Sequence, residues 1–464
     1  MYKVLFILFS AAWMNLNAHN MPIRLPSIIS DHAVFQQSAT IKLWGWGPAT
    51  LEISIVSSWA PADTVKALVA KDCTWKATIE TPKAGGTHSI EFSCGTDKQI
   101  ISDIIMGEVW LCSGQSNMEM PVSKIPDFNV VKHNVNNSIR LFQVEQSHDI
   151  YFHSDCKGKW MVCDSNTVKQ FSAVAFFFGS YLHEKLQTPV GLIHSSWGAT
   201  SIQPWMPRTA FANEEELIRE SHFGTAWAPQ ETSILYNTMI HPLAPYKLAG
   251  VIWYQGESNA LKTEEALNYG KLLKNMIQCW RAAFENDFPF YFVQIAPFDG
   301  YYPKDAAAYL REQQELTLSV PKTGMVTVGD LVDNVKDIHP LLKTGVGYRL
   351  ANLALKEVYG FQDIMPYSPK FAGLKIDKNK ARIAVSSIGK LSCKGDSING
   401  FRIAGKDKFF YQAKAVLTEE GEIILQSDKV KKTVAVRYCF SNEEVPNLFD
   451  INGLPLLAFR TDNW

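Results

Sequence analysis

Short runs in which apolar and polar residues alternate occupy the chain from residue 21 to residue 105. The runs are 40–44, 51–55, 75–79 and 88–92, with glycine- and proline-containing turns between them, as in PKAGG at 82–86. Alternation with a period of two places every second side chain on one face of a strand, and closely spaced strands with polar turns are typical of a small β-sandwich. We predict a β-sandwich domain over 21–105. We expect it to pack beside the rest of the chain rather than to bind carbohydrate by itself.

From residue 106 to residue 362 apolar strands alternate with amphipathic helices. The predicted strands are 107–112, 140–145, 190–194, 249–254, 289–295 and 325–329. The predicted helices are 173–186, which Ser172 can cap, 264–284, which Thr263 can cap, 306–320 and 341–359. Nearly continuous apolar strands between helices favour a mostly parallel sheet covered on both faces. We therefore predict an α/β domain over 106–362.

The alternating pattern returns near residue 367. The predicted strands there are 371–376, 381–385, 400–403, 413–417, 423–425 and 434–438. They indicate a C-terminal β-rich region over 367–464. The pattern leaves open whether this region packs with the N-terminal strands or stands as a small domain.

The first residues have the pattern of a secretory signal peptide. Lys3 is followed by an apolar run from Val4 to Trp13, which is too short to span a bilayer and is typical of the central part of such a signal. We predict a signal peptide over 1–18, with cleavage after Ala18, and hence an exported protein, periplasmic or extracellular. No later stretch is long and apolar enough to predict a transmembrane span.

Length and composition narrow the classes of partner. A chain of 464 residues with 46% hydrophobic and 20% charged residues is typical of a globular protein of two or three domains. The formal net charge of -1 gives no electrostatic reason to expect nucleic acid as a partner. The spacing of cysteines and histidines predicts no metal site. Eight cysteines can pair in an oxidising compartment, and the closest pairs in sequence are Cys73 with Cys94 and Cys156 with Cys163.

The stretch GEVWLCSGQSNMEMP at 107–121 carries the first candidate chemistry. It begins as an apolar strand and breaks at Ser113-Gly114, so that Ser116 follows directly after the strand. Open α/β sheets place their active sites at the carboxyl ends of strands, and backbone N–H groups in such a turn can face a developing oxyanion. We interpret Ser116 as a candidate nucleophile.

A serine nucleophile needs a base within hydrogen-bond reach and an acceptor that orients that base. His339 is the best candidate base, because it follows the predicted strand 325–329 in an irregular segment, GDLVDNVKDIHP, and precedes the last predicted helix. The competitors are His194, which ends a strand, and His241, which precedes a proline in a segment typical of buried packing. We rank His339 ahead of both.

Two further polar turns follow apolar strands. WYQGESN at 253–259 brings Gln255, Glu257 and Asn259 to the end of a very apolar strand. A side-chain amide at this position can donate to an oxyanion, and Glu257 can bond to a histidine or hold a loop. After the strand 190–194, Gly198 offers a backbone N–H that can approach an oxyanion closely.

Four of these stretches together resemble the sialate O-acetylesterase family within the SGNH (GDSL-type) hydrolases. They are GQSNM (114–118), SSWGATSIQPW (195–205), WYQGESN (253–259) and DIHP (337–340). LPSIISDHAVFQQ (25–37) and GLPLLAFRTD (453–462) match the ends of the family, so the resemblance covers nearly the whole chain that follows the predicted signal.

The resemblance implies a fold and a set of roles. It implies a flavodoxin-like SGNH-hydrolase core of three layers, α/β/α, with serine esterase chemistry and no cofactor. Carried over by position, Ser116 is the nucleophile and His339 the base. The oxyanion hole is then formed by the N–H groups of Ser116 and Gly198 and by an amide of the third stretch, Gln255 or Asn259.

The sequence departs from the family's pattern at two points. Many relatives have two glycines where this chain has Gly198-Ala199, and we expect Ala199 to be tolerated with a negative φ. The broader superfamily places its acid three residues before the histidine, where this chain has Lys336. Asp337 is the nearest carboxylate and our first choice for the acid. Glu257 and Asp333 are the alternatives.

These features predict an exported carbohydrate O-acetylesterase that acts through an acyl-enzyme. The resemblance implies that its substrate is O-acetylated sialic acid. Acetylated plant-wall polysaccharides, xylan or pectin, are the alternative substrates, because such folds change substrate through their loops. A non-catalytic glycan-binding protein on the same fold is the rival of another class, and the presence of Ser116 and His339 disfavours it. The sequence leaves the oligomeric state open.

Overall fold

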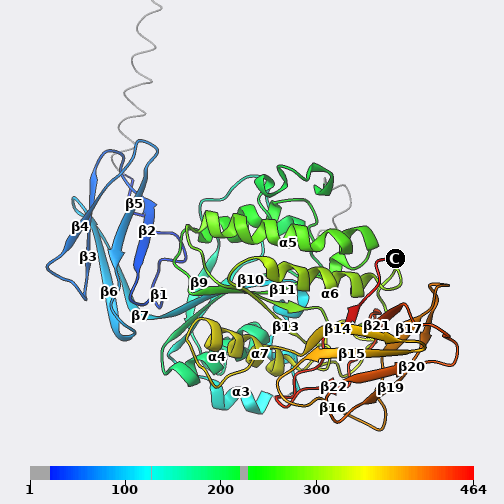
Figure 1. The fold of residues 1–464 in the computed structure, drawn as a ribbon. Coiled ribbons are helices and arrows are strands. Elements are labelled where there is room, and N and C mark those ends of the chain that lie inside the picture. The colour runs from blue at the N-terminus through cyan, green and yellow to red at the C-terminus, as the bar shows by residue number, and fades with distance from the viewer. Residues whose placement is uncertain (1–20, 127, 220–227) are drawn as a thin grey trace, which may run out of the picture.

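One long strand organises the molecule, which is described here from a computed structural model covering residues 21–126, 128–219 and 228–464. Strand β7 (Asp97–Gly114) contains 18 residues. Its first half pairs with β6 (Gly85–Cys94) and β1 (Val34–Gln36), and its second half pairs with β10 (Val190–Ser196) and β11 (Gly250–Tyr254). Figure 1 shows β7 running from the N-terminal strands into the centre of the molecule. The boundary that we expected at 105/106 therefore lies inside a continuous strand. The predicted signal peptide over 1–18 lies outside the described residues.

The N-terminal strands form two facing sheets. One contains β3 (Glu52–Ser57), β4 (Thr64–Leu68), β6, β1 and the start of β7, and the other pairs β2 (Thr40–Trp46) with β5 (Thr74–Glu80). Apolar side chains from both sheets fill the space between them, including Leu43, Ile53, Trp75, Ile90 and Phe92. The alternation in the sequence arises because every second side chain of these strands enters this space.

The central sheet is mostly parallel. Its strand order is β13-β12-β11-β7-β10-β8-β9, with β8 (Ile139–Val144), β9 (Gly158–Val162), β12 (Phe290–Gln294) and β13 (Thr323–Thr327). Only β9, at the edge of this path, runs antiparallel to its neighbour. Strands β11 and β12 and the second half of β7 are buried and largely apolar because helices cover both faces of the sheet.

Two helices cover each face of the central sheet. Helices α5 (Thr263–Ala283) and α6 (Ala306–Leu316) contact each other on one face, and α4 (Ala173–Leu186) and α7 (Lys343–Glu357) contact each other on the opposite face (Figure 1). The prediction for α4 is confirmed at both ends, and the Ser172 hydroxyl accepts the N–H of Ala175 at 3.1 Å as its cap. Thr263 is itself the first helical residue of α5, and it does not cap that helix.

The C-terminal residues form small β-sheets at the far side of the core from the N-terminal strands (Figure 1). One sheet contains β14 (Lys370–Asp377), β15 (Lys380–Ser386), β20 (Ile423–Gln426) and β19 (Lys414–Leu417), and another contains β18 (Phe410–Gln412), β17 (Phe401–Ala404), β21 (Ala435–Tyr438) and β23 (Phe459–Arg460). Arg460 joins this region to α6 through two 2.8 Å bonds from its guanidinium to Glu312. The open question of packing is thus answered, since the two β-rich regions lie apart.

All eight cysteines are unpaired thiols. The pairs Cys73–Cys94 and Cys156–Cys163, which closeness in sequence suggested, do not form. Burial raises the pKa of Cys156 and of Cys163 to about 12, so neither is a thiolate near neutral pH. Among the described residues, no helix is long and apolar enough to cross a membrane.

Reductant should not change the stability of this protein. We expect dithiothreitol to leave Tm unchanged, because no covalent crosslink restricts the unfolded chain. Protein unfolded without reductant should bind iodoacetamide at each of Cys73, Cys94, Cys112, Cys156, Cys163, Cys279, Cys393 and Cys439, as counted by mass spectrometry. Each disulfide would prevent the labelling of two cysteines. A pair of unlabelled cysteines would therefore contradict the conclusion that all eight are free thiols.

Candidate active site

Three strand ends meet at one edge of the central sheet. Ser113 lies opposite Ser195 of β10 and Trp253 of β11, and Gly114 lies opposite Ser196 and Tyr254. Because the three strands are parallel and in this register, the polar segments that follow them leave the sheet side by side. The three stretches that seemed unrelated in sequence therefore converge on one place.

Ser116 and His339 are brought together at this edge. Ser116 is the first residue of the short helix α2 (Ser116–Glu119), and His339 lies in the loop between β13 and α7. The Ser116 hydroxyl lies 2.9 Å from His339 Nε2, although 223 residues separate the two in sequence. The hydroxyl can donate to Nε2 when the ring is neutral. Burial lowers the pKa of His339 below its ordinary value of 6.5, and the nearby Lys343 ammonium acts in the same direction.

Asp337 is the carboxylate nearest to the His339 ring among the described residues, but it does not hydrogen-bond to it. Its Oδ1 lies 3.8 Å from Nδ1 and accepts the backbone N–H of His339 at 2.9 Å. The loop turns between the two residues, so the carboxylate approaches the second ring nitrogen without reaching it. Asp333 is exposed, and no contact between it and the ring is present.

Glu257 is buried beneath this pair and faces a different partner. Its Oε1 accepts the side-chain amide of Asn117 at 2.5 Å, and its Oε2 has no hydrogen-bond partner within the described part of the chain. Burial raises the pKa of Glu257, an effect that Asn117 and Lys343 partly offset. Glu257 makes no bond to His339, so its geometry favours the supporting role that we considered for it.

The side-chain amide of Asn117 connects three elements. It donates to Glu257 and to the Ile338 carbonyl, the latter at 3.0 Å, and its oxygen accepts Lys343 Nζ at 2.5 Å. Lys343 is 1% exposed, and burial lowers its pKa to about 7. Asn117 thereby holds the segment that carries His339 against the turn that carries Ser116. Sequence reasoning missed both Asn117 and Lys343. Asn117 stood next to the nucleophile within the motif, whereas nothing near Lys343 in sequence indicates its burial.

Two backbone N–H groups lie near the Ser116 hydroxyl. The N–H of Ser116 is at a helix start, where it has no intrahelical acceptor. The N–H of Gly198 is already engaged, because it donates to the carboxylate of Glu119. A Cβ at Gly198 would lie 3.0 Å from Glu119 Oε2 and 3.4 Å from Ser116 Cβ, so Gly198, the Glu119 carboxylate and Ser116 are adjacent. Burial raises the pKa of Glu119, which favours its neutral form more than in water.

Ala199 does not have the negative φ that we expected. Its φ is +56°, in the left-handed region that favours glycine. The expectation was wrong because the turn after β10 needs this conformation whichever residue occupies it. A non-glycine residue there costs about 1 kcal/mol or more. The Ala199 carbonyl accepts Gln230 Nε2 at 2.6 Å, which helps to hold the turn.

The amides of the third stretch are bonded to protein groups. Gln255 Nε2 lies within hydrogen-bond distance of three acceptors, Asn259 Oδ1 at 2.9 Å, the Thr200 carbonyl at 3.1 Å and Gln115 Oε1 at 3.2 Å. Asn259 Nδ2 donates to Gln203 Oε1 at 3.1 Å, and its Oδ1 also accepts the N–H of Ile202. Both side chains are fully buried. In this geometry they connect the turns after β10 and β11, and an oxyanion role for either stays a prediction.

The competing histidines lie elsewhere. His194 is buried, with Nδ1 2.7 Å from Gln143 Oε1 and Nε2 2.6 Å from the Ser196 hydroxyl. Burial lowers the pKa of His194 to about 3, so it is a neutral packing residue. His241 Nδ1 bonds to the His153 carbonyl at 3.1 Å, away from Ser116.

A family model described as carbohydrate esterase, sialic acid-specific acetylesterase, matches residues 106–356, which is more than half of the chain. The chain belongs to this family of esterases. It is therefore a carboxylic ester hydrolase by family. The matched region includes Ser116, Gly198, Glu257 and His339, the residues that surround the carboxyl ends of the central strands.

Curated relatives of this esterase match along most of their length. The sialate O-acetylesterase of Homo sapiens is 30% identical over 387 residues, covering 74% of this chain and 72% of the relative. That of Mus musculus is 28% identical over 414 residues, covering 75% of each. A solved structure of a carbohydrate acetylesterase from Xanthomonas citri is 32% identical with a TM-score of 0.86, covering 95% of this chain and 100% of that one. The esterase thus shares its whole architecture with that enzyme.

Gly114 should be irreplaceable in this esterase. Its φ is +145°, and a Cβ there would lie 2.1 Å from the Tyr254 carbonyl oxygen. We expect Gly114→Ala to cost about 3 kcal/mol or more, because two parallel strand backbones would have to separate. Thermal unfolding measures this cost.

Gly95→Ala is the matched control for Gly114→Ala. Gly95 also has a positive φ, +59°, but no atom lies within 4 Å of its Cβ position. Gly95→Ala should lower the free energy of unfolding by only about 1 kcal/mol. Equal losses for the two variants would contradict the close approach of β7 and β11.

Proposed function

We propose that this protein is an exported serine esterase that removes O-acetyl groups from sialic acids on an SGNH-hydrolase fold. The observation that carries the proposal is the 2.9 Å contact between Ser116 Oγ and His339 Nε2 at the carboxyl edge of a parallel sheet. The curated relatives named sialate O-acetylesterase support the substrate class. Export rests on the sequence of residues 1–18, and the oligomeric state stays open.

In the first half-reaction Ser116 Oγ attacks the acetyl carbonyl carbon while His339 Nε2 takes the hydroxyl proton. The tetrahedral intermediate carries its negative charge on the former carbonyl oxygen, which the N–H groups of Ser116 and Gly198 stabilise. When the C–O bond to the sugar breaks, His339 returns the proton to the sugar oxygen. Acetyl-Ser116 and a free sugar hydroxyl result.

In the second half-reaction a water molecule attacks acetyl-Ser116, and His339 takes its proton. The bond between the acetyl carbon and Ser116 Oγ then breaks, and His339 protonates the serine oxygen. Acetate leaves, and the enzyme is restored. Asp337 is our choice for the group that stabilises the imidazolium formed in both steps, since its Oδ1 at 3.8 Å needs only a small movement to reach Nδ1.

Glu119 has to release the Gly198 N–H during this reaction. A charged carboxylate at that donor would repel the oxyanion, and the donor cannot serve both groups fully. We infer that the substrate carbonyl displaces the Glu119 carboxylate, whose Oε1 remains bonded to Gln146 Nε2 at 3.0 Å. A sugar hydroxyl is a suitable new donor to the displaced carboxylate.

Acetylated xylan or pectin stays the alternative substrate, and a glycan-binding protein without catalysis stays the rival from another class. Acetate release from O-acetylated sialic acid and from acetylated xylan distinguishes the two substrates. Release from neither would favour the non-catalytic rival. The Ser116–His339 contact favours catalysis, because Ser116 is partly exposed at the carboxyl edge of the sheet, whereas the Ser196–His194 pair is buried.

Ser116→Ala should abolish the esterase activity. We expect kcat to fall by ~10⁴-fold or more, as for the loss of a triad nucleophile. Tm should change little, because the hydroxyl is partly exposed and fills no core space. Acetate release from O-acetylated sialic acid measures the loss. Activity within tenfold of the parent would remove Ser116 from the mechanism.

The dependence of kcat/KM on pH should report the pKa of His339, and its change in Asp337→Asn should identify the acid. The base must be neutral, and its pKa lies below 6.5, so kcat/KM should rise with pH, pass half of its maximum below pH 6.5 and then level off. Asp337 raises the pKa of His339. Asp337→Asn should therefore move the midpoint to lower pH and reduce kcat by ~10²–10⁴-fold.

Glu257→Gln is the matched control for the acid. It removes a carboxylate that does not touch the ring, so kcat should fall less than in Asp337→Asn. Tm should fall, because Lys343 loses the charge that faces it. A larger loss of kcat in Glu257→Gln than in Asp337→Asn would transfer the acid role to Glu257.

A further inference from the structure

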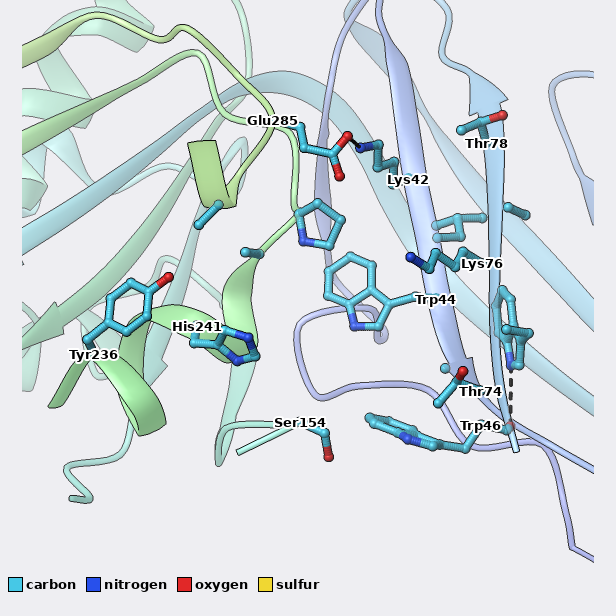
Figure 2. Close-up of a pocket in the computed structure, with 17 residues that line it drawn as sticks. Lys42, Trp44, Trp46, Thr74, Lys76, Thr78, Ser154, Tyr236, His241 and Glu285 are labelled. Carbon is cyan, nitrogen blue, oxygen red and sulfur yellow. Dashed lines mark hydrogen bonds and ion pairs between the residues drawn. The ribbon is translucent and has the colours of Figure 1, made fainter. Parts of the chain in front are cut away.

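A groove separates the N-terminal sandwich from the loops of the catalytic core, and nothing in the proposed reaction uses it. Its volume is about 860 Å³, within the range of ligand sites. One wall is the β2–β5 sheet, and the other is formed by segments that lead into β11 and out of α5 (Figure 2). None of its lining residues belongs to the cluster around Ser116.

The strand register places aromatic and cationic side chains on the wall of the sandwich. In β2, Leu43 points into the sandwich and is fully buried, so Lys42, Trp44 and Trp46 share the outer face. Trp44 lies opposite Lys76 of β5 in the antiparallel register. Trp44 packs partly against the apolar core, but neither indole is fully buried. Here they face the groove.

The opposite wall supplies polar groups. Figure 2 shows Tyr236, His241 and Ser154 across the groove from Trp44 and Trp46. His241 Nδ1 donates to the His153 carbonyl, and in that tautomer Nε2 is the acceptor. Such an acceptor suits a sugar hydroxyl.

The described residues that line the groove include two lysines, Lys42 and Lys76, and one carboxylate, Glu285. Lys42 forms an ion pair with Glu285 across the groove (Figure 2). Lys76 forms no ion pair with any residue that the structure describes, although its charge adds to the effect of Lys42 in lowering the pKa of Glu285. It lies opposite Trp44 in the register of β2 and β5, so the two side chains share one face of the sheet. Arg24 covers one face of Trp46 at 3.7 Å, so that face is not available to a ligand. An ammonium in excess of the groove's carboxylates, on the same sheet face as an indole, matches a ligand that has both a carboxylate and an apolar ring face.

We propose that this groove binds a glycan through a sugar residue that carries a carboxylate, at a site separate from the catalytic centre. The C–H face of the sugar ring stacks on Trp44, since C–H groups with partial positive charge are attracted to the face of an indole. Lys76 pairs with the carboxylate, and His241 Nε2 accepts a ring hydroxyl. The groove would hold an acidic glycan on the protein while its acetyl groups are processed elsewhere.

The test is titration calorimetry with 3′-sialyllactose, which has no ester and is not turned over. The ligand should bind the full chain, and Trp44→Ala should raise Kd by tenfold or more. Lys76→Gln should raise Kd several-fold, and Lys76→Glu should abolish binding at the groove. Lactose and the methyl ester of 3′-sialyllactose, which have no carboxylate, should bind more weakly than the acid.

Lys66→Gln is the matched control, because Lys66 lies on β4 in the other sheet, paired with Glu52. It should leave Kd unchanged. Lys76 is exposed, so its variants keep the fold even if Trp44→Ala does not. Inhibition of 4-nitrophenyl acetate hydrolysis by 3′-sialyllactose reports the catalytic centre and should be the same in all groove variants.

The groove proposal and the catalytic proposal fail separately. Binding at the groove should persist in Ser116→Ala, whatever that change does to turnover. Unchanged affinity in Trp44→Ala and in both Lys76 variants would overturn the groove site. Equal binding of the acid and its methyl ester would overturn the carboxylate as the group recognised.

Discussion

The buried amide of Asn117 is the interaction on which the catalytic geometry depends. An amide is the one side chain that can donate to Glu257 and to the Ile338 carbonyl while it accepts from Lys343. A buried carboxylate and a buried ammonium would each be costly alone. With Asn117 between them, both are bonded, and the His339 loop is fixed beside the turn that carries Ser116. The short Ser116–His339 contact follows from this arrangement.

The continuity of β7 places this site in a larger rigid body. Because one strand belongs to both sheets, the sandwich cannot rotate as an independent module. Tyr246 of the core adds to the contact between the core and the sandwich, because its hydroxyl donates to the Val34 carbonyl at 2.6 Å and its ring stacks on Phe35. Yet the outer face of β2 and β5 is not closed by the core. Strands β1 and β7 connect the sandwich to the core through one of its two sheets. The other sheet, β2–β5, is separated from the core by the groove.

The turn after β10 shows how function strains local structure. Ala199 adopts a positive φ, and Glu119 occupies the Gly198 N–H that faces the nucleophile. The positive φ of Ala199 is unfavourable because a residue with a Cβ adopts the left-handed region. The position of Glu119 is unfavourable because a carboxylate is buried. They are tolerated because Gln230 and Gln146 bond to the turn and to the carboxylate.

The sequence by itself determined what depends on near neighbours along the chain. Alternation and helical periodicity located the main helices and most core strands to within a few residues, although they missed β1, β4, β9 and the first half of β7. Ser116 and His339 were recognisable because each follows a strand in a polar turn. Only the tertiary structure decided contacts between distant residues. Lys343 lies 226 residues from Asn117, and no local pattern indicates that its ammonium is buried. The 3.8 Å separation of Asp337 from the ring, the Glu119 contact and the groove likewise arise from how whole elements pack, which periodicity does not encode.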